Sequence, residues 1–249
     1  MKSVLRDLGG ALRFFSRLPI PGGEGDFARS LRLAPLAGAL LGLAGGLVFI
    51  AALSLRLPVA AAALLGLGFG ALVTGGLHED GLADIADGFG GGFTAARKLE
   101  IMKDSRIGAF GALALILSVG LRASALAALA ARPASALLVM ITAGALSRAA
   151  ALAPLALLPP ARADGAGRAA GASGALNPAF LLALPFAFPP ALGVFDAAIC
   201  FKALLLAGVS VLGLSALARD QIGGQTGDVA GAAQQVAEIA VLLVFSAAI

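Results

Sequence analysis

Three aspartates lie at helical spacing in a chain that is otherwise strongly apolar. Asp80, Asp84 and Asp87 are four and three residues apart, so a helix places them on one face. Carboxylates on one stripe repel one another unless a cation lies between them, and their oxygens suit a hard divalent ion such as Mg²⁺. The spacing therefore predicts a metal site, with Asp80 as our first candidate for a general base.

A basic pair follows the acidic stripe along the chain. Lys103 and Arg106 lie just before the next apolar segment begins. Both can hold phosphate oxygens, and Arg can do so in bidentate fashion. Contact with lipid headgroups is the alternative interpretation of a basic pair beside a membrane. The sequence alone does not separate these two roles.

A glycine-rich turn at residues 223–228 ends in an acid and leads into the last apolar segment. Asp228, Gln235 and Glu238 follow one another at helical spacing on one face. Polar groups inside an apolar segment are costly unless they meet a partner, so we expect this face to form a second wall of the same site. The turn itself could hold phosphate, although its glycine spacing matches no standard P-loop.

Isolated polar residues inside apolar segments need partners as well. Arg148 is expected to face the bundle interior, toward an acid or a substrate anion, and a purely structural ion pair is the alternative. The sequence offers no clear acidic partner for Arg122. His78 is the only histidine, and beside Glu79 it is more typical of a hydrogen-bonded interface residue than of a metal ligand.

The reaction class follows from this inventory of groups. Clustered carboxylates, cations and glycine turns suit metal-assisted transfer of a phosphoryl or nucleotidyl group. The inventory does not suit acyl transfer, because no serine or cysteine is placed with a partner base.

The elements that must position these groups are predicted to be membrane helices. The chain has 249 residues, 59% hydrophobic and only 13% charged, whereas soluble domains carry roughly 25% charged residues. We therefore predict an all-α fold, a polytopic membrane bundle forming a single domain over residues 1–249. Segments long and apolar enough to span a bilayer are 33–55, 57–77, 107–131, 134–158, 178–195, 197–218 and 231–249, about seven transmembrane helices.

Charge distribution sets the expected orientation. With the N-terminus in the cytoplasm, most Lys and Arg residues lie on the inner side of the cell inner membrane. The polar segments 78–106, 161–177 and 219–228 then all face the cytoplasm, with the active site among them. The net charge of +4 reflects this topology, and the lack of an aromatic and basic surface argues against nucleic acid.

The N-terminal segment 5–20 is predicted to be an amphipathic helix at the cytoplasmic interface, with Phe14 and Phe15 in lipid. Arginines interrupt its apolar run, so it does not resemble a signal peptide.

Several blocks of the sequence resemble the hallmark motifs of the cobalamin synthase family. They are residues 78–88 (HEDGLADIADG), 101–108 (IMKDSRIG) and 223–228 (GGQTGD), in the family's order. Residues 15–21 (FSRLPIP) and Ser147–Arg148 also fit, so the resemblance covers nearly the whole chain.

The resemblance implies an adenosylcobinamide-GDP ribazoletransferase, an integral membrane enzyme of late cobalamin biosynthesis. Such an enzyme uses Mg²⁺ while α-ribazole, or its 5′-phosphate, displaces GMP from adenosylcobinamide-GDP. The product is adenosylcobalamin or its 5′-phosphate. The expected partners are these substrates, membrane lipid and other cobalamin-pathway enzymes.

The same motifs imply the site residues. Asp80 and Arg148 are expected to be catalytic. The expected substrate-binding residues are His78, Lys103, Arg106, Gln225 and Thr226. The expected metal ligands are Asp80, Asp84, Asp87 and Asp228.

Two other functions share part of this pattern. Asp84-x-x-Asp87-Gly88 is similar to part of the CDP-alcohol phosphotransferase motif, but the Ala-Arg expected after that glycine is absent. A carboxylate-lined transporter also places acids in helical bundles broken by Pro and Gly. Against it, this chain is short, shows no inverted repeat and gathers its acids at one face.

Overall fold

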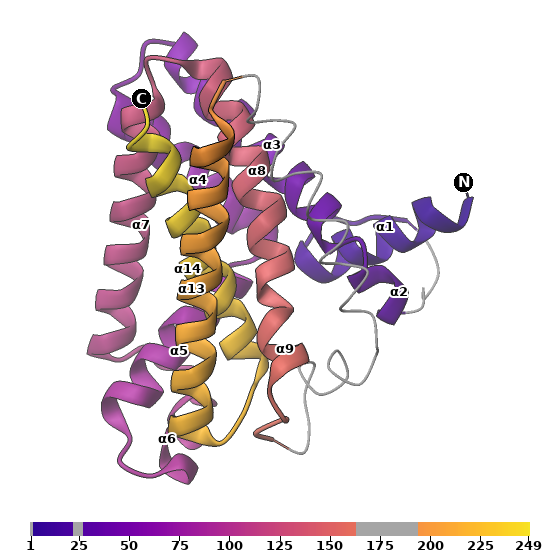
Figure 1. Ribbon diagram of the computed structural model, residues 1–249, viewed down its shortest axis with the longest axis vertical. Coiled ribbons are helices and arrows are strands. Elements are labelled where there is room, and N and C mark those ends of the chain that lie inside the picture. Colours follow the sequence, from indigo (N-terminus) through magenta and orange to yellow (C-terminus); the bar gives the residue numbers. More distant parts are fainter. Residues whose placement is uncertain (1, 22–26, 163–193) are drawn as a thin grey trace.

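The computed structural model describes residues 2–21, 27–162 and 194–249, and within these ranges every regular element is a helix. Figure 1 shows a bundle of long helices, with α1 and α2 on its flank and α5 and α6 at one end. The helices are α1 (Lys2–Phe15), α2 (Phe27–Leu31), α3 (Ala34–Ser54), α4 (Val59–Thr74), α5 (Leu77–Gly91), α6 (Ala95–Ile101), α7 (Ala109–Leu129), α8 (Pro133–Ala151), α9 (Ala153–Leu157), α13 (Ala197–Ile222) and α14 (Gly227–Ser246).

The all-α membrane bundle is confirmed. Five helices or helix pairs in the described ranges are long and apolar enough to span a membrane, namely α3, α7, α8 with α9, α13 and α14. A bent pair, α4 with α5, would make a sixth. The expected count of seven is not confirmed, because the segment predicted at 178–195 lies outside the described residues, except for Val194 and Phe195.

The span expected at 57–77 ends early, at a sharp break. Helix α4 stops at Thr74, and Gly75 and Gly76 follow with φ angles of 69° and 71°. This left-handed conformation favours glycine, so the pair can end a helix inside an apolar run. The chain turns by 91°, and α5 begins at Leu77. Hydropathy alone does not predict this break, which directs the acidic helix α5 away from α4.

Helix α14 lies at the centre of the bundle and packs against α5, α7, α8 and α13. Helices α3 and α8 approach each other closely where Gly38 faces Gly144, and a Cβ on either residue would collide with the backbone of the other. Small residues at such crossings are typical of membrane helices. The rigid frame that supports α5 is therefore built largely from α14, α7 and α8.

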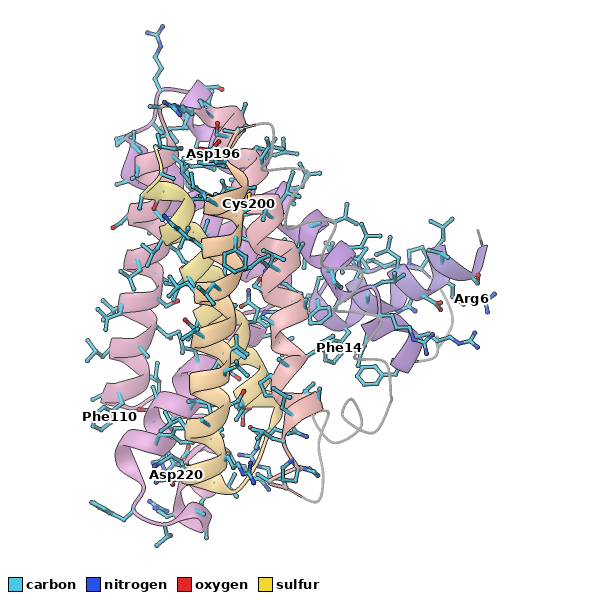
Figure 2. The ribbon with its side chains drawn as sticks, in the orientation of Figure 1. Arg6, Phe14, Phe110, Asp196, Cys200 and Asp220 are labelled. Carbon is cyan, nitrogen blue, oxygen red and sulfur yellow. The ribbon has the colours of Figure 1, made fainter. Side chains whose placement is uncertain are left out.

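Polar segments gather at one end of the bundle. Phe110 and Asp220 mark the end that carries α5 and α6, and Asp196 and Cys200 lie toward the opposite end (Figure 2). Segments 78–106 and 219–228 share the first end, as expected. Of the third polar segment, 161–177, only Ala161 and Arg162 are described.

The N-terminal helix is present as α1, although it ends at Phe15 and not at residue 20, and Phe15 is not available to lipid as expected. Phe15 is only 2% exposed and stacks on His78, with ring centroids 5.9 Å apart. Phe14 packs edge-to-face against Phe15 and Phe27. The reason is that the chain folds back after α1, where the backbone N–H of Arg17 donates to the carbonyl of Val73 at 2.8 Å.

Candidate functional site

A cleft of about 820 Å³ opens where the end of α1, the α4–α5 break, helix α5 and the α6–α7 loop meet. Segments far apart in sequence thus line one space. Its charged lining residues are the acids Asp80, Asp84, Asp87 and Asp104 and the cations Arg17, Lys103 and Arg106. Acids and cations therefore meet in one space, which is what a metal–phosphate substrate requires.

Helix α5 presents the predicted acidic stripe to this cleft. Asp84 interacts electrostatically with Asp80 and Asp87 on its own helix, and with Asp228 at the start of α14. Neither Asp80 nor Asp84 forms an ion pair with any residue that the structure describes. These two carboxylates are therefore not compensated by a directly paired cation of the described part of the chain.

Asp87 has a second role that the sequence pattern did not predict. Its Oδ2 accepts from the backbone N–H of Gly108 at 2.7 Å, and its Oδ1 from that of Gly111 at 2.8 Å. Both amides belong to the first turn of α7, where backbone N–H groups lack helical partners. Asp87 thus caps α7 and holds the α6–α7 loop against the acidic helix.

The donor set fits Mg²⁺ in its usual protein environment. No group of three or more His, Cys, Asp and Glu side chains in the described ranges is close enough to enclose a metal. Mg²⁺ is usually bound by one or two carboxylates together with substrate phosphates, and dedicated cages of protein ligands are uncommon. Asp80 and Asp84, lacking other partners, match this requirement.

The predicted basic pair lies at the Asp87 end of the cleft, in the loop that Asp87 caps. Arg106 forms a two-pronged pair with Asp104, with Nη2 2.6 Å from Oδ2. Side-chain and backbone hydrogen bonds from Arg106 lower the pKa of Asp104 to about 2, so the pair stays ionised near neutral pH. Lys103 has no ion-pair partner among the described residues and is available to an anion.

The glycine-rich turn places one acid beside the site and otherwise serves the fold, because Asp228 interacts electrostatically with Asp84 but is not among the described residues that line the cleft. Thr226 caps α14 by accepting from the N–H of Val229 and donates to Asp228 at 3.2 Å. Asp228 also pairs with Arg162 at 3.3 Å. Gln225 is buried, and its backbone bonds to Pro159 and Ala161. Gln225 and Thr226 are not among the described residues that line the cleft.

His78 is likewise turned away from the cleft. It is 3% exposed and stacks on the ring of Phe15. Its expected contact with substrate stays a prediction.

A second polar cluster lies inside the bundle. Arg148 Nη1 donates to Glu238 Oε2 at 2.8 Å, while Arg122 Nη1 lies 3.2 Å from Glu79 and 3.4 Å from Glu238. These two arginines and two glutamates therefore neutralise one another. They line a cavity of about 50 Å³ that shares only Thr74 with the lining of the cleft.

Amides and hydroxyls complete this interior network. Gln235 donates to Glu79 at 3.1 Å and accepts from Ser118 at 2.8 Å. Gln234 donates to Glu238 and, at 3.0 Å, to Ser147. Side chains from α5, α7, α8 and α14 are thereby joined. Gln235 and Glu238, expected to be a second wall of the metal site, instead lie on the interior cavity with Arg148.

Comparison with known proteins decides the family. A family model described as Cobalamin-5-phosphate synthase matches residues 7–246. The chain belongs to this family. No solved structure matches the chain.

Members of the cobalamin-5-phosphate synthase family from several bacteria are similar over nearly their full length. The chain is 49% identical to the adenosylcobinamide-GDP ribazoletransferase of Azorhizobium caulinodans, covering 96% of this chain and 95% of that protein. It is 48% identical to the protein of the same name from Bradyrhizobium diazoefficiens, covering 99% and 95%. For that of Mesorhizobium japonicum the identity is 47%, covering 100% and 95%.

Two features of this family member were not predicted from the sequence, namely the partners of Arg122 and the position of Arg17. Arg122 does have acidic partners, Glu79 and Glu238, which lie 43 and 116 residues away along the chain. A signal was present, since two arginines and two glutamates in apolar surroundings must compensate one another. Arg17, in contrast, was noted only as part of a motif, and no spacing rule connects it with the acids of α5.

Proposed function

We propose that this protein is an adenosylcobinamide-GDP ribazoletransferase. It joins α-ribazole, or its 5′-phosphate, to adenosylcobinamide-GDP and releases GMP. The observation that carries the proposal is the cleft in which unpaired Asp80 and Asp84 meet the cations of the α6–α7 loop. Membership of the cobalamin-5-phosphate synthase family, together with the names of the relatives, supports the choice of substrates.

The reaction is a displacement at phosphorus. A ribazole hydroxyl oxygen bonds to the phosphorus that carries cobinamide, and the bond from this phosphorus to the GMP oxygen breaks. The hydroxyl proton passes to a carboxylate, with Asp80 our first choice because it lines the cleft without an ion-pair partner. Lys103, which has no ion-pair partner among the described residues, holds the negative charge on the departing GMP, and Arg106 supports it from its pair with Asp104.

We further propose that Asp80 and Asp84 hold Mg²⁺. When bound, this ion neutralises charge on the pyrophosphate. Asp228 and Asp87 are the two further predicted ligands, although each is already engaged, Asp228 with Arg162 and Asp87 with the amides of α7. Their main contribution is to hold the neighbouring elements in place around the two free carboxylates.

For Arg148, predicted to be catalytic, we propose a positioning role. Its pairing with Glu238 places it in the network that contacts α5 through Glu79. This network acts on the cleft through helix α5.

The active site is proposed to face the cytoplasm of a bacterial inner membrane, because the basic loops lie at the end of the bundle that carries α5 and α6. The other enzymes of cobalamin synthesis are proposed neighbours in the cell. Co-purification of these enzymes with the protein, without crosslinker, would support this association, and its failure would argue against it.

The test uses the purified protein in liposomes with adenosylcobinamide-GDP, α-ribazole 5′-phosphate and Mg²⁺. Chromatography follows GMP and the corrinoid product. We expect GMP release that requires both substrates and stops with EDTA. Folded protein that forms no product would contradict the proposal, and uptake assays in the same liposomes would then test the transporter alternative.

A further inference from the structure

Arg17 occupies a position in the cleft for which the chemistry above provides no role. It follows α1 directly, its side chain is exposed, and it lines the cleft with Asp80 and Asp84. Its backbone is fixed by the hydrogen bond to Val73. A Cβ on Gly75 would collide with Nε of Arg17. The α4–α5 break therefore leaves room for this guanidinium, which reaches the cleft across the glycine.

The positive charge of Arg17 is not compensated by an acidic side chain in the described part of the protein. Arg106 pairs with Asp104, Arg162 with Asp228, and the two interior arginines with glutamates. Arg17 forms no ion pair with any described residue, although acids line the same cleft. A fixed, exposed and unpaired guanidinium is well suited to bind a phosphate in bidentate fashion.

The cations of the cleft lie at its two ends. Arg17 lies beside Gly75, next to the start of α5, where the backbone N–H of Asp80 donates to the carbonyl of Gly76. Lys103 and Arg106 belong to the loop that is capped by Asp87, at the other end of the stripe. Seven residues of helix separate Asp80 from Asp87, which is about 10 Å. A cleft with two cationic ends can hold two phosphate-bearing groups at once.

We propose that Arg17 binds a substrate phosphate at the Asp80 end of the cleft. This inference rests on the proposed function and adds a substrate-binding residue to it. The phosphate has two possible sources, the 5′-phosphate of the α-ribazole acceptor and the pyrophosphate of adenosylcobinamide-GDP. We favour the 5′-phosphate of α-ribazole at Arg17, because Lys103 and Arg106 at the other end of the cleft are the proposed contacts of the pyrophosphate.

The experiment measures GMP release in liposomes by wild type, Arg17→Gln and Arg17→Lys. The matched control is Arg6→Gln, since Arg6 is exposed near the free end of α1, away from the bundle (Figure 2). KM is determined separately for adenosylcobinamide-GDP, α-ribazole 5′-phosphate and unphosphorylated α-ribazole. Size-exclusion chromatography of each variant in detergent verifies folding.

We expect Arg17→Gln to raise KM for one phosphate-bearing substrate by about tenfold to hundredfold, since a charge-assisted hydrogen bond is lost. Arg17→Lys should recover part of this loss. A higher KM for α-ribazole 5′-phosphate alone assigns the acceptor phosphate. A higher KM for adenosylcobinamide-GDP with either acceptor assigns the pyrophosphate.

KM values for Arg17→Gln that equal those of Arg6→Gln would overturn the proposal, as would a lower kcat with every KM unchanged. Failure of the proposed function gives a different result, because wild type itself would then release no GMP and both proposals would fall together.

Discussion

Asp87 shows how one carboxylate can serve both a binding cleft and the fold. Each of its oxygens accepts a backbone N–H from the start of α7, at 2.7 and 2.8 Å. This pins the loop that bears Lys103 and Arg106 to the helix that bears Asp80 and Asp84. The position of the α6–α7 loop in the cleft therefore depends on a side chain whose residue type, taken alone, suggests only metal binding.

We expect Asp87→Asn to loosen the α6–α7 junction, because an amide has one acceptor oxygen where the carboxylate has two. The lost hydrogen bond should cost about 1–3 kcal/mol locally. Hydrogen–deuterium exchange in detergent should be faster at the amides of residues 108–112. The control is Asp220→Asn, an exposed residue of α13. Unchanged exchange in the Asp87 variant would contradict the capping role.

At the scale of helices, the interior network fixes the orientation of α5. Glu79 and Asp80 are neighbours in sequence but face different spaces, Glu79 the interior cavity and Asp80 the cleft. Because Glu79 binds Arg122 on α7 and Gln235 on α14, rotation of α5 about its axis would break buried contacts. The network thereby keeps the aspartates directed into the cleft.

Removal of one charge from this network should be costly. We expect Arg122→Met to destabilise the protein by about 3–5 kcal/mol, since Glu79 and Glu238 would be left buried without full compensation. Thermal unfolding in detergent measures the loss, with Arg132→Met, an exposed loop residue, as control. Adding Glu79→Gln to Arg122→Met should restore part of the stability. Equal melting temperatures for the two arginine variants would refute this account.

The helices themselves were largely predictable from sequence, because long apolar runs and the four-and-three spacing of Asp80, Asp84 and Asp87 are local signals. The break at Gly75–Gly76 was not, since Gly45–Gly46 is a similar pair that continues as helix within α3, whereas Gly75 and Gly76 both take the left-handed conformation. The partners of Asp87 lie 21 and 24 residues away, and those of Arg122 lie further still. Tertiary packing determines which distant residues form such contacts, and local patterns in a single sequence do not reveal it.

At the scale of the whole molecule, the end of the bundle that carries α5 and α6 is expected to face the cytoplasm. Cys200 is buried, so introduced cysteines can report the topology. Ser105→Cys in the α6–α7 loop should react with a membrane-impermeant maleimide in inverted vesicles, whereas Ser54→Cys at the end of α3 should react from the periplasmic side in spheroplasts. The reverse pattern would contradict the orientation.

The fold presents the acids of α5 in a cleft at one end of a membrane bundle. We propose that these acids carry out the transfer. The most direct measurement compares GMP release, at increasing Mg²⁺ concentrations, by wild type, Asp84→Asn and Asp220→Asn. Asp220 lies at the same end of the bundle but outside the cleft (Figure 2). The account predicts that only Asp84→Asn loses turnover, while it still inserts and folds. Normal turnover by folded Asp84→Asn would contradict it.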